Sequence, residues 1–479
     1  MAASSSATGV VRKMTDQKAP DEGATGGANP GVRIFSATWV LPIASDPIQD
    51  GAVAVEGDRI AAVGETAAVT SRFPDAEVTD FHHTIIMPGF VNCHSHLEYA
   101  VFRGLMDNEN FGPWMLEFLD HKAKLSYDDY EVSALLGACE CASSGLTTSA
   151  DSMYSGASLA AIRRAGLRAV ACQEIFGLDD NKLGETMAEL TGRLDLLEEN
   201  ISELIDLGIA PHATYTVSAS LYRAVAELAR ERGMRFTTHL AESKEESVYI
   251  RSGSGILAHD FREKVGWDYL SHEPFGVTPV KYLQQWNVFG PDFLAAHCVH
   301  VAPADVEALA RYDVAIAHCP KSNAKLGCGI APLPDFLEAG IRVGFGTDSP
   351  ASSNIMDMFG EMRTAIFLHR GAQSDATVLG AEECVQMATL GGARALGMEG
   401  RIGSLEPGKQ ADIIAVDMEY SHFTPIHDPY SALVFGANQE DVFFTMVAGQ
   451  TLYARKVFVT LDSERITAKA REVKGKLWR

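Results

Sequence analysis

Helix-like and strand-like hydrophobic patterns alternate along the middle of the chain. Residues 221–233, LYRAVAELARERG, repeat apolar residues at helical spacing and end at Gly233, and the strand-like run MRFTTHLAE follows. The same succession returns in FLAAHCVHV, PADVEALARYD and VAIAHCP, and again in LPDFLEAG and IRVGFGTDSP. Continued through about 280 residues, this alternation predicts a parallel sheet covered by helices, and a closed (β/α)8 barrel of the TIM type fits the length best.

The two ends of the chain carry short apolar runs broken by turn residues. β-Branched runs separated by Asp-Pro, Asp-Gly and Gly-Asp begin the ordered part, and similar runs return in GSLEPGKQADIIAVD and FFTMVAGQTLYARKVF. We therefore expect an α/β protein in which residues 31–86 and 405–465 form a small composite β-sandwich beside a barrel of residues 87–404. Residues 1–30, rich in Ala, Ser and Gly, are predicted to be a disordered tail, and residues 466–479 a C-terminal tail.

Composition and charge narrow the classes of function. The 479 residues include 63 acidic and 40 basic ones, and the formal net charge of −23 disfavours nucleic-acid binding because phosphate backbones would be repelled. The chain has no apolar run near the roughly 20 residues that span a bilayer, and no apolar core of a signal peptide. Eight cysteines in so long a chain do not suggest a disulfide framework, and Cys172, Cys298 and Cys319 are predicted to be small buried hydrophobes. These features predict a cytoplasmic protein that binds neither nucleic acid nor membrane.

Polar residues gather where the predicted strands end. His94 and His96 lie one residue apart in VNCHSHLEYA, and side chains two positions apart in a strand point to the same side. Catalytic groups of a barrel of this kind lie at the carboxyl ends of its strands. The other strand ends add five candidates, which are His212, His239, Glu242, His297 and Asp348.

These residue types suit metal-assisted hydrolysis. Three neutral imidazoles and one carboxylate fit Zn²⁺ or Fe²⁺ and leave a coordination position for water. A bound metal would make hydroxide available near neutral pH, and Glu242 would shuttle a proton to the leaving group. His297 and Asp348 could orient the hydroxide from the other side. The pattern therefore predicts hydrolysis at a carbon that bears an amine or a similar leaving group.

Each candidate also has a structural alternative. An isolated His-x-His pair arises from chance or packing more often than from a metal site, but this pair ends an apolar run after Met-Pro-Gly. Asp348 in GTDSP could instead cap the following helix. His297 and His300 are three apart and would face opposite sides of a strand, and His297 is preferred because it is nearer the apolar run. The contributions of His300 and His318 are left open.

Other enzyme classes lack their motifs in this chain. There is no PCxxC, HExxH, GxGxxG or P-loop pattern. A non-catalytic scaffold that kept the fold is a further reading, which the complete set of ligands and Glu242 disfavours.

Six ordered motifs resemble the amidohydrolase superfamily. They are PGFVNCHSHLE, HLAESKEE, AAHCVHV, AHCPKSNAKLGCGIAP, GTDSPAS and GSLEPGKQADIIAVD, and the resemblance runs from about residue 32 to residue 460. The most similar branch contains cytosine and guanine deaminases, S-adenosylhomocysteine and methylthioadenosine deaminases, aminofutalosine deaminase and the s-triazine hydrolases. The resemblance implies a (β/α)8 barrel beside a composite β-sandwich.

The resemblance also implies roles for individual residues. One divalent metal ion, Zn²⁺ with Fe²⁺ as the alternative, is expected on the ligands His94, His96, His239 and Asp348. Glu242 is expected to shuttle protons, and His297 to contact the water or the substrate. The expected substrate-binding residues are His212, Trp114, Gln173 and Asn323.

The resemblance favours a deaminase in which metal-bound hydroxide attacks a ring carbon and ammonia leaves. The preferred substrate is an aminated purine or nucleoside, either aminofutalosine or an adenosine-like compound. The alternatives are an s-triazine chlorohydrolase or aminohydrolase and an S-adenosylhomocysteine/methylthioadenosine deaminase. The S-adenosylhomocysteine reading is disfavoured because PWMLEFLDHKAKLS and ACQEIFG lack the acidic residue and the arginine of those enzymes. The expected partner is a small aminated heterocycle, and a homo-oligomer is compatible with this branch.

Overall fold

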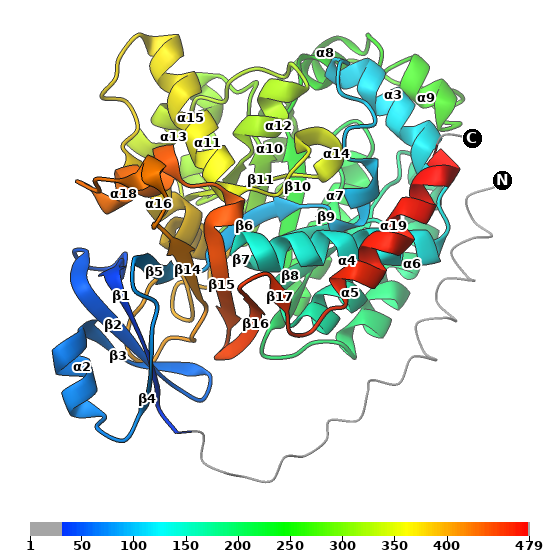
Figure 1. The fold of residues 1–479 in the computed structure, drawn as a ribbon. Coiled ribbons are helices and arrows are strands. Elements are labelled where there is room, and N and C mark those ends of the chain that lie inside the picture. Colours follow the sequence, from blue (N-terminus) through cyan, green and yellow to red (C-terminus); the bar gives the residue numbers. More distant parts are fainter. Residues whose placement is uncertain (1–30, 478–479) are drawn as a thin grey trace.

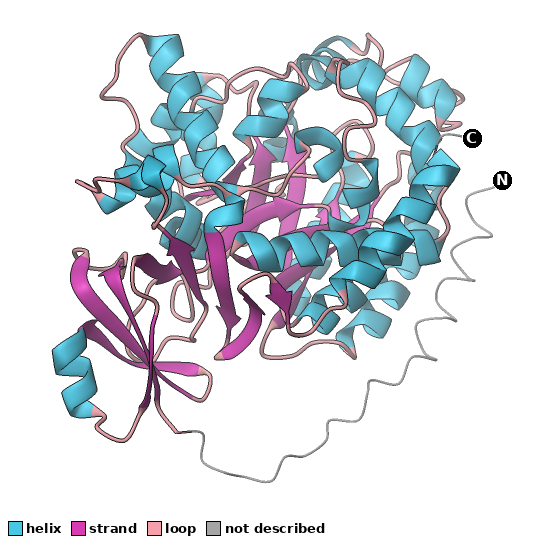
Figure 2. Ribbon diagram, viewed as in Figure 1, coloured by secondary structure: helices cyan, strands magenta, loops and turns pink. Residues whose placement is uncertain are grey.

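Two sheets organise the chain in the computed structural model, which describes residues 31–477 (Figures 1 and 2). One is a barrel of eight parallel strands surrounded by helices, and the other is a nine-stranded mixed sheet that lies beside it. Both features confirm the predicted fold class. The predicted disordered tail of residues 1–30 falls outside the described residues.

Each barrel strand pairs with its neighbour in sequence, so the strand order runs without a break from β6 to β13. An isolated parallel bridge between Ser95 and Asp348 joins the first strand of the barrel to the segment that follows its last strand. Asp348 N also donates a hydrogen bond of 2.9 Å to His94 O. The barrel therefore closes beside the predicted metal ligands. Its strands are β6 (Phe90–Ser95), β7 (Leu146–Met153), β8 (Arg168–Ile175), β9 (Ile205–Pro211), β10 (Arg235–Leu240), β11 (Phe293–His297), β12 (Ala315–His318) and β13 (Val343–Phe345).

Helices cover the outside of the barrel and its carboxyl end. Those that follow barrel strands or flank the cavity are α3 (Phe111–Lys122), α4 (Tyr127–Ser144), α5 (Ala157–Ala165), α6 (Leu183–Glu198), α7 (Ala219–Arg232), α8 (Lys244–Ser252), α9 (Asp260–Lys264), α10 (Pro279–Gln285), α11 (Pro303–Arg311), α12 (Pro320–Lys325), α13 (Leu333–Glu338), α14 (Pro350–Ser353), α15 (Met358–Gln373), α16 (Ala381–Gln386) and α17 (Gly392–Ala395). Short 3-10 or π turns are η1 (Leu97–Phe102), η2 (Asp180–Lys182), η3 (Met387–Gly391), η4 (Ser421–Phe423), η5 (Ala432–Gly436) and η6 (Gln439–Asp441).

The mixed sheet is assembled from both ends of the chain, as predicted (Figure 1). The two parts meet where β14 pairs antiparallel with β5. Its strands are β1 (Arg33–Val40), β2 (Ile48–Glu56), β3 (Arg59–Glu65), β4 (Glu77–Asp80), β5 (Thr84–Pro88), β14 (Ile413–Asp417), β15 (Val442–Val447), β16 (Gln450–Ala454) and β17 (Val457–Phe458), with the helices α2 (Thr66–Arg72) and α18 (Pro429–Ser431).

The predicted C-terminal tail is a helix as far as the chain is described. Helix α19 (Ser463–Leu477) packs against α4 (Figure 1), and Lys476 Nζ is 2.7 Å from both carboxylate oxygens of Asp129 in α4. The residues that α19 buries form an apolar stripe at helical spacing, namely Ile466, Ala470, Val473 and Leu477. The many charged residues between them make this stripe hard to recognise in the sequence. No secondary structure is predicted from the sequence for residues 466–479, and α19 covers this segment as far as Leu477.

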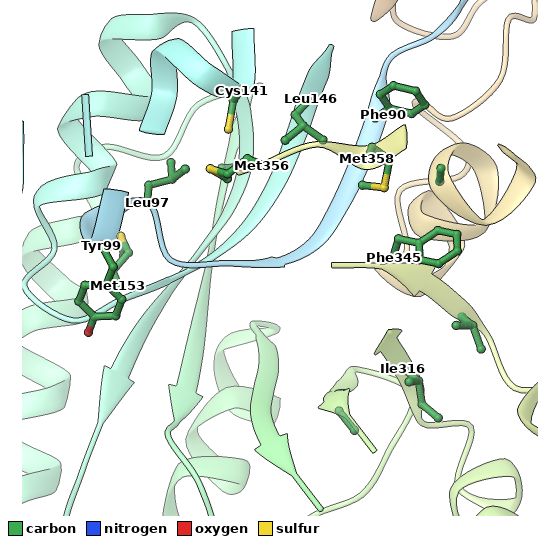
Figure 3. Packing of buried hydrophobic residues seen from close by; sticks show 14 of the residues in the cluster. Phe90, Leu97, Tyr99, Cys141, Leu146, Met153, Ile316, Phe345, Met356 and Met358 are labelled. Carbon is green, nitrogen blue, oxygen red and sulfur yellow. The ribbon is translucent and has the colours of Figure 1, made fainter. Parts of the chain in front are cut away.

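Small side chains fill the inside of the barrel. The interior cluster includes Ala150, Val170, Cys172, Leu294 and Ala296, and larger apolar side chains pack between the strands and the helices (Figure 3). All eight cysteines are free and buried, which confirms the prediction for that residue type. Among residues 31–477, no helix is long and apolar enough to cross a membrane.

A buried ion pair connects the barrel to the mixed sheet. Arg168, the first residue of β8, donates hydrogen bonds of 2.8 and 3.0 Å to the two carboxylate oxygens of Asp412, beside β14. Asp412 also accepts a hydrogen bond of 2.8 Å from Ala448 N. The side chains are 0% and 3% exposed, so the loss of one partner would leave the other charge buried and unpaired.

We expect Asp412→Ala to lower the free energy of unfolding by about 3–5 kcal/mol, because the Arg168 guanidinium would lose its counterion in a dry environment. Chemical denaturation measures the change. The control is Glu227→Ala, which breaks an exposed pair with Arg223 and is expected to cost less than about 1 kcal/mol. Equal small effects would show that the pair does not stabilise the contact between the two sheets.

Candidate metal centre and active site

Four predicted ligands meet at the carboxyl end of the barrel. His94 lies in β6, His96 directly follows that strand, His239 lies in β10, and Asp348 follows β13. All four side chains are buried, with at most 8% of any residue exposed. The barrel therefore brings together residues that are up to 254 positions apart in the sequence.

The separations between the ligand atoms fit one metal ion. His96 Nε2 is 3.2 Å from His239 Nε2, and Asp348 Oδ1 is 3.5 Å from His94 Nε2 and 3.7 Å from His96 Nε2. Ligands of a tetrahedral zinc ion, each about 2.0–2.1 Å from the metal, are roughly 3.3–3.4 Å apart. The donor set also has the mixture of imidazole and carboxylate that zinc prefers.

The hydrogen bonds of two histidines fix the ring nitrogens that face the centre. His96 Nδ1 donates to Ser152 O at 3.0 Å, and His239 Nδ1 donates to His212 O at 2.7 Å. With the proton on Nδ1, each neutral ring presents a lone pair at Nε2, and burial lowers the pKa of both rings. Two lone pairs 3.2 Å apart repel unless a cation lies between them. His94 Nε2 is buried and has no hydrogen-bond partner either. These side chains therefore fit a metal ion.

Asp348 is held in place by two serines. Its Oδ2 accepts hydrogen bonds from Ser322 Oγ at 2.6 Å and from Ser352 Oγ at 2.7 Å, so Oδ1 remains for the centre. The backbone of Asp348 has φ +56°, a left-handed conformation that costs energy for a residue with a side chain. The N-cap of the following helix α14 is Ser349, not Asp348. The helix-capping alternative for Asp348 is therefore wrong.

Glu242 and His297 lie on the other side of the centre. His297 Nε2 is 3.8 Å from Glu242 Oε1, and its Nδ1 donates to Asn323 Oδ1 at 2.9 Å. Burial lowers the pKa of His297 to about 4, so the ring is neutral and its unpartnered Nε2 accepts hydrogen bonds. Burial, followed by the charge of Asp348, raises the pKa of Glu242 well above its usual value. A carboxyl group with a raised pKa is suited to holding and releasing a proton.

The inward position of His297 depends on a local break in the strand pattern. Leu294 and Ala296 pack inside the barrel, so strict alternation would turn His297 outward. His297 has φ +73° instead, and this left-handed backbone brings its ring within 5.3 Å of the His94 ring. Strained backbone of this kind gathers at functional sites.

A cavity opens beside the centre, and its empty space, counted together with its open mouth, is about 640 Å³. Its walls are mainly aromatic, and the rings of Trp114 and Phe118 stack at 5.1 Å while those of Phe176 and His212 stack at 4.8 Å. The lining residues are His96, Tyr99, Phe111, Trp114, Met115, Phe118, Leu119, Lys122, Glu174, Phe176, His212, Tyr215, Thr216, His239, Glu242, Phe261, Leu326, Asp348 and Ser349.

Two of the four predicted substrate-binding residues line this cavity. His212 and Trp114 do so, and the buried Nε1 of Trp114 has no hydrogen-bond partner. Gln173 instead donates to Met153 O and Glu174 O, at 3.1 Å each. Asn323 lies behind His297 and orients its ring. These last two residues are not among those that line the cavity, and their contact with substrate stays a prediction.

The two histidines that the sequence left open also lie outside the cavity wall. The His300 ring donates from Nε2 to Cys328 O at 2.8 Å, which occupies that nitrogen. His318 is buried against Phe345 and His369, and neither ring nitrogen has a hydrogen-bond partner among the described residues.

Sequence reasoning missed Lys122 and Glu174. Strand parity could have found Glu174, because Val170 and Cys172 pack inside the barrel and the next residue of the same parity in β8 is Glu174, not Gln173. Lys122 gives no comparable signal, because it lies at the end of α3, where a lysine usually interacts with free carbonyl groups.

Comparisons with known proteins agree with this geometry. A family model described as "Amidohydrolase family" matches residues 85–452, more than half of the chain. The chain belongs to the amidohydrolase family. A second model, described as an imidazolonepropionase-like composite domain of bacteria, matches residues 51–76. That segment lies in the composite sheet of this amidohydrolase.

Two curated relatives cover nearly the whole chain. The 5-methylthioadenosine/S-adenosylhomocysteine deaminase of Desulforudis audaxviator (strain MP104C) is 34% identical over 441 residues, which are 92% of this chain and 97% of that protein. The enzyme of the same name from Moorella thermoacetica (strain ATCC 39073 / JCM 9320) is 35% identical over 433 residues, 90% of this chain and 96% of that protein.

Solved structures show the same fold. An adenosine deaminase from Xanthomonas campestris with bound zinc has a TM-score of 0.83 at 28% identity and covers 94% of this chain and 100% of that chain. The atrazine chlorohydrolase from Arthrobacter aurescens TC1 complexed with zinc has a TM-score of 0.78 at 24% identity, over 92% of this chain and 99% of that chain, which shows the fold alone. Together the comparisons confirm the predicted superfamily and the predicted enzyme class, an amidohydrolase-family deaminase that acts on C–N bonds of cyclic amidines.

We expect His239→Ala to remove most of the bound metal, because the protein would lose one of the two lone pairs that face each other. Elemental analysis of the purified protein measures the metal content, with about one ion per chain expected before substitution. The control is His300→Gln, since His300 lies outside the cavity wall, and this variant is expected to keep its metal. Full metal content in His239→Ala would contradict the assigned ligand set.

Proposed function

We propose that this amidohydrolase is a zinc-dependent deaminase of aminated purine nucleosides, of the methylthioadenosine/S-adenosylhomocysteine type. The observation that carries the proposal is the position of Glu242, a buried carboxyl group between the His-rich centre and an aromatic cavity. This arrangement suits proton transfer to a leaving group on a flat heterocycle.

The names of the relatives favour this substrate class over the first choice from the sequence. Aminofutalosine was preferred because the chain lacks two residues of the S-adenosylhomocysteine enzymes. The curated relatives described above, at 34% and 35% identity, are named methylthioadenosine/S-adenosylhomocysteine deaminases. We therefore propose methylthioadenosine and S-adenosylhomocysteine as substrates ahead of aminofutalosine.

The zinc structure of the Xanthomonas protein supports zinc as the metal. The residues that would hold it are His94, His96, His239 and Asp348. A bound zinc ion would act as a Lewis acid and lower the pKa of water to about 7. Every other contribution comes from the side chains of this chain.

Glu242 carries the proton through the reaction. Its carboxylate accepts a proton from the attacking water and donates it to the amino group, which leaves as ammonia while the ring carbon gains an oxygen. His297 accepts a hydrogen bond from the water at its free Nε2, and Asn323 keeps that nitrogen unprotonated by binding the Nδ1 proton. The stacked pairs Trp114–Phe118 and Phe176–His212 offer flat faces to a purine ring.

The activity test is ammonia release by the zinc-loaded protein across a panel of compounds. The panel contains methylthioadenosine, S-adenosylhomocysteine, adenosine, aminofutalosine, guanine, cytosine and an aminotriazine. Ammonia from one of the first three, abolished by a chelator and restored by zinc, is the expected result. Ammonia from the aminotriazine alone would overturn the nucleoside proposal and favour triazine hydrolysis.

We expect Glu242→Gln to lower kcat by about 10²–10⁴-fold, because the amide cannot accept and return the proton. The metal content should not change, since Glu242 is not among the four ligands. The matched control is Glu245→Gln in α8, outside the cavity wall, which should keep its activity. Unchanged turnover in Glu242→Gln would show that another group moves the proton.

A further inference from the structure

Two side chains of opposite charge interrupt the aromatic wall of the cavity. Glu174 lies near the end of β8, Lys122 is the last residue of α3, and both line the cavity. Neither takes part in the proton transfer described above. The Glu174 carboxylate lies close to His96 and His239, and its Oε1 is 3.9 Å from His96 Nδ1, the ring nitrogen that faces Ser152 rather than the centre.

The Glu174 carboxylate has an unused acceptor. The residue is 3% exposed, and its Oε1 has no hydrogen-bond partner. Buried carboxylate oxygens are nearly always hydrogen-bonded because desolvation is costly. Since Glu174 lines the cavity, the free oxygen is positioned to accept a hydrogen bond from a bound molecule.

The Lys122 ammonium is held by aromatic faces. Its Nζ lies 3.3 Å from the ring centroid of Tyr154, 5.2 Å from that of Tyr99 and 5.5 Å from that of Phe176. Among the described residues, Nζ donates no hydrogen bond to an oxygen. Cation–π contact holds the charge in place but leaves the N–H donors free.

Lys122 and Glu174 interact electrostatically within the cavity wall. Burial lowers the pKa of Lys122 and raises that of Glu174, and the interaction between them opposes both shifts. The wall therefore offers a bound molecule the free Oε1 of Glu174 as an acceptor and the N–H groups of Lys122 as donors. Neutral groups that carry both a donor and an acceptor complement such a pair.

We propose that Glu174 and Lys122 are specificity-determining residues that bind the two neighbouring hydroxyl groups of the substrate's sugar. One hydroxyl donates to Glu174 Oε1, and the other accepts from Lys122 Nζ. The position supports this, because Glu174 lies on the far side of His96 from the metal-facing nitrogen, where the part of a substrate remote from the reacting carbon would lie. The inference rests on the proposed nucleoside deaminase activity and adds the residues that recognise the sugar.

The test compares adenosine with 2′-deoxyadenosine and 3′-deoxyadenosine, each of which lacks one hydroxyl. Ammonia release by the zinc-loaded protein gives kcat and KM for the unsubstituted protein, for Glu174→Gln and for Lys122→Met. We expect each variant to raise KM for adenosine by about 10–100-fold, because a hydrogen bond to a charged group is lost, while its values for one deoxynucleoside stay nearly unchanged. Glu245→Gln and Lys244→Met are the matched controls outside the cavity wall, and both should keep the preference for adenosine.

An equal loss of kcat/KM for all three nucleosides would overturn the proposal, because the pair would then act on the ring or on folding. Metal content and thermal denaturation are measured for each variant. If Glu174→Gln loses zinc, the kinetics of Lys122→Met alone test the sugar assignment, since Lys122 does not contact a metal ligand.

The failure of the proposed function gives a different result. The unsubstituted protein would then release no ammonia from any aminopurine nucleoside. Calorimetric titration with inosine, which has the sugar but no amino group, tests the pair without turnover. Weaker binding of inosine to Glu174→Gln and Lys122→Met supports the sugar assignment, and no difference from the unsubstituted protein overturns it.

Discussion

The repulsion between two buried lone pairs is the constraint on which the active site depends. His96 and His239 direct unprotonated nitrogens at each other across 3.2 Å, and backbone carbonyls accept their other ring protons. The rings cannot turn away without breaking those hydrogen bonds inside the protein. A cation between them removes the repulsion. The hydrogen bonds from the Nδ1 atoms to backbone carbonyls therefore determine that the Nε2 atoms are the ones free to bind metal.

The contacts that close the barrel also position the metal ligands. The last strand meets the first where Asp348 N donates to His94 O, and both residues are ligands. Gly346 permits this approach, since a Cβ there would lie 2.8 Å from the Cβ of His94. The strained backbone at His297 and Asp348 is supported by the same closed sheet. A weaker barrel would therefore lose its metal geometry along with its fold.

The groups assigned to the reaction and those assigned to substrate binding lie in different parts of the cavity. Glu242, His297 and the ligands surround the reacting end, whereas Lys122 and Glu174 lie in the wall beyond His96. Aromatic rings line the cavity between these groups. The two charged residues are placed by different elements, the end of helix α3 and the end of strand β8.

Local patterns in the sequence determined the alternation of strands and helices, the composite sheet and the ligand motifs, because each depends on residues a few positions apart. The helix at the C-terminus was missed because its charged residues mask the buried stripe of α19. Strand parity, which is local, could also have placed Glu174 rather than Gln173 in the cavity wall. Only the tertiary structure decided that Asn323 binds the His297 ring and that Lys122 enters the wall. The reason is physical: the left-handed backbone at His297 and the position of helix α3 set where these side chains point, and both depend on contacts between segments far apart in the chain.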